Sequence, residues 1–99
     1  MRYEIGLAGR ILRPEGAEAW LDEVMASLAS LPRADPAIGG SMADGEIEIA
    51  ITVEGDGIEP AITRATSLVR DAMNSAGAGN DAVVWERLVA TTAVAAPAR

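Results

Sequence analysis

The sequence predicts an α+β fold in which one four-stranded antiparallel sheet carries two helices on one face. Residues 2–12 and 46–54 alternate apolar and polar side chains with the period of two that half-buried strands show. Residues 14–31 and 62–76 instead repeat apolar side chains every three or four positions, as amphipathic helices do. With two further, weaker strands, the predicted order is strand, helix, strand, strand, helix, strand.

The first half of the chain contains the first strand and the first helix. In residues 2–12 the apolar positions are Tyr3, Ile5, Leu7 and Ile11. Pro14 suits the first turn of a helix, where its missing N–H costs nothing. Pro32 ends the helix, because the residue before a proline avoids helical geometry. The apolar stripe of this helix consists of Ala17, Trp20, Leu21, Val24, Leu28 and Leu31.

The second half begins with a weak strand at residues 37–42, followed by the tight-turn signal Asp44-Gly45. The strand at 46–54 is the clearest in the chain. The second helix begins either at a capping box formed by Asp56 and Glu59 or at Pro60 as its first residue. It ends at the glycine-rich segment 77–80. The last strand, residues 81–94, is apolar on both faces, so its register cannot be read.

This order of elements predicts the ferredoxin-like, or split βαβ, arrangement with spatial strand order 4-1-3-2. We expect a single domain over residues 1–94, because no composition shift or long linker divides it. Residues 95–99 are expected to form a flexible tail.

Composition excludes several classes of chemistry. The chain has 99 residues, no Cys and no His, so disulfides, thiol nucleophiles and histidine bases are excluded. We therefore expect neither an enzyme nor a bound cofactor or metal. A net charge of −7 argues against nucleic acid and anionic membranes as partners. The start of the chain lacks an apolar signal-peptide core, and a cytoplasmic location is expected.

Two helices on one face leave the other face of the sheet uncovered. Its expected centre is small, and its ends carry Arg and Glu side chains that can pair across the strands. A solvated face and a docking or self-association surface are equally compatible with this pattern. The interface residues predicted on the first and third strands are Arg2, Glu4, Ala8, Arg10, Glu46, Glu48, Ala50, Thr52 and Glu54.

Trp85 is the other candidate interface residue. On the helix side it would belong to the core, and on the open side it would anchor an interface. The undetermined register leaves both placements open. The carboxylates of Glu4, Glu46 and Glu48 could cluster on the open face and bind a divalent cation, but solvated strand glutamates are the better interpretation.

Three resemblances accompany this interpretation. The segment Pro14-Glu15-Gly16 before an amphipathic helix is similar to the turn of ACT domains, which implies a small-ligand regulatory role. Dimeric α+β barrel monooxygenases share the element order, but the His-, Asn- or aromatic-rich pockets they use are missing here. The Tyr3-containing first strand, the acid-alternating 46–54 strand and the Val69-Arg70 pair resemble small stand-alone actinobacterial or actinophage ferredoxin-like proteins of unknown function.

The sequence thus favours a non-enzymatic interaction module. It would use the open sheet face and an edge strand to form a homodimer or to dock on a protein partner. The alternative is an ACT-like ligand-binding domain that uses the turn between Gly9 and Gly16.

Overall fold

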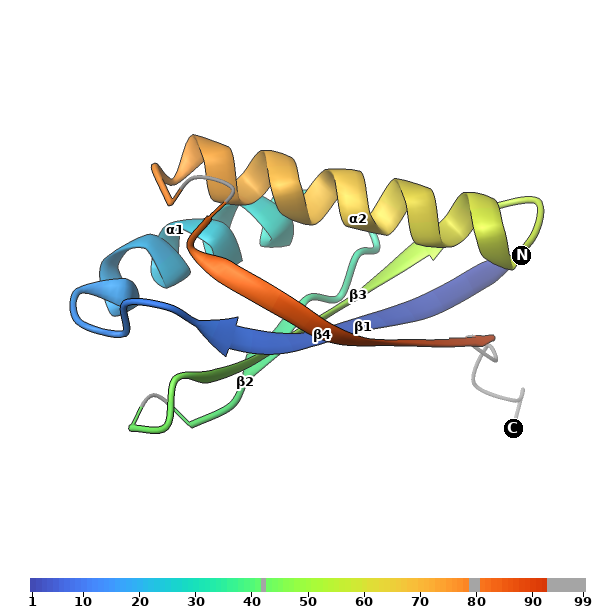
Figure 1. Ribbon diagram of the computed structural model, residues 1–99. Coiled ribbons are helices and arrows are strands. Elements are labelled where there is room, and N and C mark those ends of the chain that lie inside the picture. The colour runs from blue at the N-terminus through green and yellow to red at the C-terminus, as the bar shows by residue number, and fades with distance from the viewer. Residues whose placement is uncertain (42, 79–80, 93–99) are drawn as a thin grey trace, which may run out of the picture.

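The fold is the predicted ferredoxin-like arrangement. The computed structural model describes residues 1–41, 43–78 and 81–92. One sheet forms the lower layer, and both helices lie together on its upper face (Figure 1). The elements in chain order are β1 (Arg2–Ile11), α1 (Ala17–Ala29), β2 (Ala37–Gly39), β3 (Glu46–Glu54), α2 (Ile58–Ser75) and β4 (Val83–Thr92).

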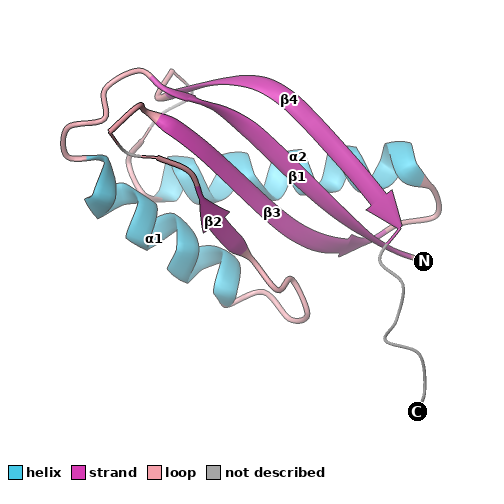
Figure 2. Ribbon diagram, turned by 90° about the horizontal axis from the view of Figure 1, so that it is seen from below, coloured by secondary structure: helices cyan, strands magenta, loops and turns pink. Residues whose placement is uncertain are grey.

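The spatial order of the strands is β2-β3-β1-β4, with every pair antiparallel. This is the predicted 4-1-3-2 order, and Figure 2 shows it from the uncovered side. β1 and β3 pair along their whole length, with Ile5 opposite Ile51 and Leu7 opposite Ile49. The two strands with the clearest alternation therefore form the centre of the sheet, and β2 and β4 form its edges.

The core lies between the sheet and the helices and is apolar throughout. Alternate residues of β1 and β3 point into it, and they meet the buried stripes of both helices. Among the described residues no polar or charged side chain is buried. The largest fully buried side chains are Ile5, Val24, Leu28, Ile47, Ile49, Ile51 and Val69.

Both helices begin differently from the prediction. α1 starts at Ala17, after Gly16 in a left-handed conformation, and Pro14 lies in the preceding turn, where its carbonyl accepts the N–H of Ala17 at 3.1 Å. α2 starts at Ile58, so Pro60 is its third residue rather than its first, and no side chain caps it. A proline is tolerated there because the first four N–H groups of a helix lack intrahelical partners.

The predicted stop of α2 is present as a Schellman motif. Gly77 has φ 81°, its N–H donates to the carbonyl of Asn74 at 3.1 Å, and the N–H of Ala78 donates to that of Met73 at 3.0 Å. α1 ends at Ala29, three residues before Pro32. β2 is shorter than predicted, and the expected tail at 95–99 lies outside the described residues.

We expect Gly77→Ala to lower the free energy of unfolding by about 1 kcal/mol, because an L side chain is strained at positive φ. No atom lies within 4 Å of the added Cβ, so the cost comes from the backbone alone. Urea titration followed by circular dichroism measures the change, and Gly77→Asn should lose less because asparagine tolerates this conformation. Equal stability of wild type and Gly77→Ala would contradict the assignment of this cap.

Candidate functional site: the open sheet face

The sheet face that the helices leave uncovered is the candidate site, and we call it the open face. The register places Gly6 of β1 opposite Ala50 of β3 on one side and opposite Val89 of β4 on the other. All of the predicted interface residues of β1 and β3 alternate with buried positions, and they therefore lie on this face. They are Arg2, Glu4, Ala8, Arg10, Glu46, Glu48, Ala50, Thr52 and Glu54.

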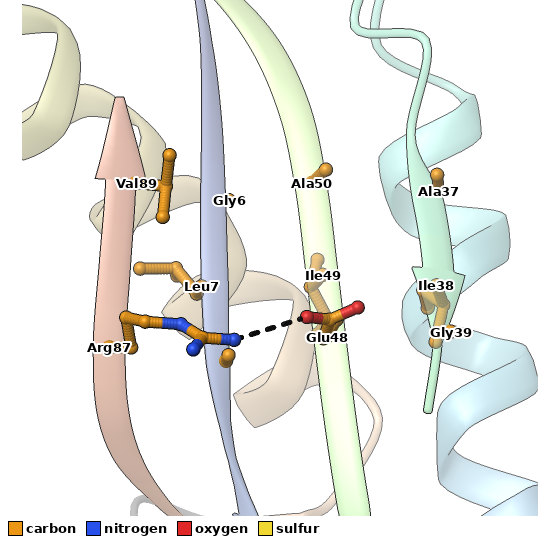
Figure 3. A pocket seen from close by; sticks show the side chains of 11 residues that line it. Gly6, Leu7, Ala37, Ile38, Gly39, Glu48, Ile49, Ala50, Arg87 and Val89 are labelled. Carbon is orange, nitrogen blue, oxygen red and sulfur yellow. Dashed lines mark ion pairs between the residues drawn. The ribbon is translucent and has the colours of Figure 1, made fainter. Parts of the chain in front are cut away.

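The centre of the open face is hollowed because its residues are small. The hollow has a volume of about 350 Å³ and opens away from the helices (Figure 3). Val89 stands on the β4 side, and the three-residue strand β2 borders the opposite side. The small residues that line the hollow are Gly6, Ala8, Ala37, Gly39 and Ala50.

An ion pair spans the open face next to this hollow. Arg87 Nη2 of β4 lies 3.6 Å from Glu48 Oε1 of β3 (Figure 3). Ala8 of β1 pairs with both residues in the register, and its small side chain allows the two long ones to meet above it. Both side chains are about two-thirds exposed, so the pair contributes at most about 1 kcal/mol.

The cross-strand Arg–Glu ion pairs predicted between β1 and β3 are replaced by other contacts. Arg2 lies opposite Glu54 and Arg10 opposite Glu46, but neither couple forms an ion pair in the described part of the chain. Arg2 Nη2 instead donates to the carbonyl of Arg33 at 2.6 Å, and Arg33 Nη1 lies 3.7 Å from Glu54 Oε1. Arg33, in the loop after α1, therefore contacts both Arg2 and Glu54 in place of the predicted ion pair between them.

The carboxylates of Glu4, Glu46 and Glu48 do not form a cluster on the open face. Glu4 lies opposite Thr52, Glu46 opposite Arg10, and Glu48 opposite Ala8, which spreads the three carboxylates along the face. Within residues 1–41, 43–78 and 81–92 no group of three acidic side chains is placed to hold a metal ion.

Trp85 lies on the helix side of the sheet, which decides between its two predicted placements. It pairs with Gly9, a position of β1 that points toward the helices, and it lines a hollow with Val69 and Met73 of α2. It is nevertheless 36% exposed. Trp85 is therefore not part of the open face, and any interface role would belong to the edge of β4.

β4 is an edge strand with large apolar side chains exposed on both faces. Val84 and Val89 lie on the open face, while Trp85 and Leu88 lie on the helix side, where α2 packs more closely on β1 and β3 than on β4. These four side chains are 36–53% exposed. Exposed apolar edges favour association with other chains, and natural proteins usually protect them.

The turn proposed for an ACT-like ligand is partly occupied by the chain itself. Gly45 packs against it, with the carbonyl oxygen of Ile11 3.1 Å from the position where a Cβ of Gly45 would be. The N–H of Ile11 also donates to the Gly45 carbonyl at 2.6 Å. The ACT-like hypothesis stays a prediction. None of the described helices is long and apolar enough to cross a membrane.

The comparisons with known proteins support the fold. No family model and no curated protein match the chain. A crystal structure from Chloroflexus aurantiacus, named "putative Antibiotic biosynthesis monooxygenase", is similar, with a TM-score of 0.65 and 14% identity over 99% of this chain and 98% of that one. At this identity the likeness establishes that the two chains share the ferredoxin-like fold over their whole length.

Proposed function

We propose that this protein is a self-associating domain in which two copies pack through their open faces and β4 strands. The observation that carries the proposal is that a hollow lined by small residues and exposed valines occur on the same face. Val84 and Val89 of each copy supply the apolar side chains that the hollow of the other copy lacks. A surface that carries both the projection and the recess is self-complementary, as a two-fold interface requires.

Charge favours a second copy as the occupant of the open face. The register gives this face four glutamates and three arginines, so its charges nearly cancel, whereas the whole chain carries −7. Two copies joined by their open faces keep most of the negative charge on the outside. Association through α1, which carries three acidic residues and no basic one, would instead bring like charges together. The charged residues are Glu4, Glu46, Glu48, Glu54, Arg2, Arg10 and Arg87.

Sedimentation velocity over a range of concentrations tests the proposal. The wild type is expected to sediment as a dimer, and Ala50→Arg as a monomer, because the long side chain would fill the hollow that the valines of the second copy are proposed to enter. Thr63→Arg is the matched control, since Thr63 is exposed on α2, away from the sheet. This variant should remain a dimer.

Circular dichroism verifies that both variants are folded. A wild type that remains monomeric at 200 µM (roughly the range of weak dimers), or an Ala50→Arg variant that dimerises like the wild type, would overturn the proposal.

The structural neighbour favours one second candidate function, which is a monooxygenase reaction with O2, because that protein is named a "putative Antibiotic biosynthesis monooxygenase". Oxygen uptake with a panel of small phenols, with and without reduced flavin, tests it. Turnover that is lost in Trp85→Ala and retained in Trp20→Phe would support catalysis at the hollow beside Trp85. Oxygen uptake equal to that of the protein-free control would refute it.

A further inference from the structure

A second hollow lies on the helix side of the sheet, between α2 and β4, and the proposed self-association does not use it. Its volume is about 390 Å³, within the range of small-molecule sites. Its walls come from one face of α2, from β1 and from β4. The lining residues are Leu7, Thr66, Val69, Arg70, Met73 and Trp85.

Gly9 explains how Trp85 comes to form a wall of this hollow. Gly9 occupies an inward position of β1 between Leu7 and Ile11, and it leaves that position without a side chain. The Trp85 ring takes this place, with its Cε3 atom 3.1 Å from where a Cβ of Gly9 would be. The indole is thereby held at the edge of the core, with part of its surface exposed.

The hollow offers hydrogen-bond donors but few acceptors. Among the described residues, neither the guanidinium of Arg70 nor the indole N–H of Trp85 takes part in a hydrogen bond or ion pair. The hydroxyl proton of Thr66 is already donated to the carbonyl of Ile62 at 2.7 Å. None of the described residues that line the hollow carries a carboxylate, although the chain as a whole is acidic.

We propose that this hollow binds a small carboxylate whose body is apolar. Leu7, Val69 and Met73, with the indole face, would cover the apolar body. The guanidinium of Arg70 matches a carboxylate in charge and in its forked geometry. A neutral alcohol of the same length can accept a hydrogen bond but offers no charge and no second oxygen to the guanidinium, and a cationic ligand would be repelled.

Binding can be measured through Trp85 fluorescence in the Trp20→Phe background, where Trp85 is the only tryptophan. The probes are octanoate, 1-octanol and octylamine, which share one chain length and differ in charge. We expect octanoate to change the Trp85 emission and to bind about 10-fold more tightly than 1-octanol, which corresponds to about 1.4 kcal/mol. Octylamine should bind more weakly than either.

Arg70→Gln should abolish the preference for octanoate while 1-octanol still binds. Arg64→Gln is the matched control, because Arg64 is also an exposed arginine of α2 but does not line this hollow. Titration of Ala50→Arg in the same background separates ligand binding from self-association. The proposal fails if none of the three probes binds at millimolar concentration, if 1-octanol binds as tightly as octanoate, or if Arg70→Gln keeps the preference.

Discussion

Gly9→Ala is expected to lower the free energy of unfolding by about 3 kcal/mol, at the upper end of the cost of overpacking a core. A Cβ at this position would overlap the carbonyl oxygen of Val84 and lie 3.0 Å from Cα of Trp85. Both are backbone atoms of the paired strand, so β4 itself has to move. Urea titration followed by circular dichroism measures the loss, at a fixed protein concentration because self-association would add to stability.

Gly6→Ala is the matched control. Gly6 lies three residues away on the same strand, on the open face, and a Cβ there would meet its nearest neighbour, the carbonyl oxygen of Val89, at an ordinary 3.9 Å. We expect this variant to change stability by less than about 1 kcal/mol. Similar losses in both variants would show that strand glycine in general, and not the approach of β4 to Gly9, is responsible.

The centre of the sheet could be predicted from sequence because each of its strands has one buried and one open face. In β1 and β3 every second residue is buried, so a slip of one residue would turn one of the two buried rows toward solvent. The two strands are neighbours and antiparallel as expected, and the observed register places Arg2 opposite Glu54 and Arg10 opposite Glu46. The sequence could not show that Arg33, in a loop, competes for the same carboxylate.

β4 could not be predicted in the same way because its alternation is interrupted. The register with β1 shifts between Ala8 and Gly9, where Arg87 and Trp85 are the successive partners and one residue is left over. Trp85 and Leu88 consequently share the helix side although three positions separate them. The same bulge places Arg87 on the open face, so its pairing with Glu48 was missed.

The helix starts were misassigned for a related reason. Local capping signals compete with the geometry of the preceding turn. Gly16 at φ 77° directs the chain into α1, whereas Gly57 before α2 is in ordinary extended conformation, and neither helix has a side-chain cap. Pro14 and Pro60 are compatible with helix starts, but they do not determine the first residue of either helix.

Ile49→Ala is expected to lower the free energy of unfolding by about 4 kcal/mol. Ile49 is completely buried in the middle of β3, between Leu7 of β1 and Ile38 of β2. Its loss removes apolar burial and leaves a cavity that the flanking strands cannot collapse into, because their backbones are fixed by the sheet. A 99-residue domain has roughly 5–15 kcal/mol of stability, so this loss is a large share of the total. Thermal and urea unfolding by circular dichroism give the value.

Glu48→Ala is the control on the neighbouring residue, which faces the other way. It removes the ion pair with Arg87, whose side chains are mostly exposed, and we expect a loss below about 1 kcal/mol. The contrast between adjacent positions tests the premise on which the open face depends, namely that the helices cover one side of the sheet only. If Glu48→Ala were as destabilising as Ile49→Ala, the open face would be part of a core in the folded protein. In that case its role as a surface available to a second copy would be wrong.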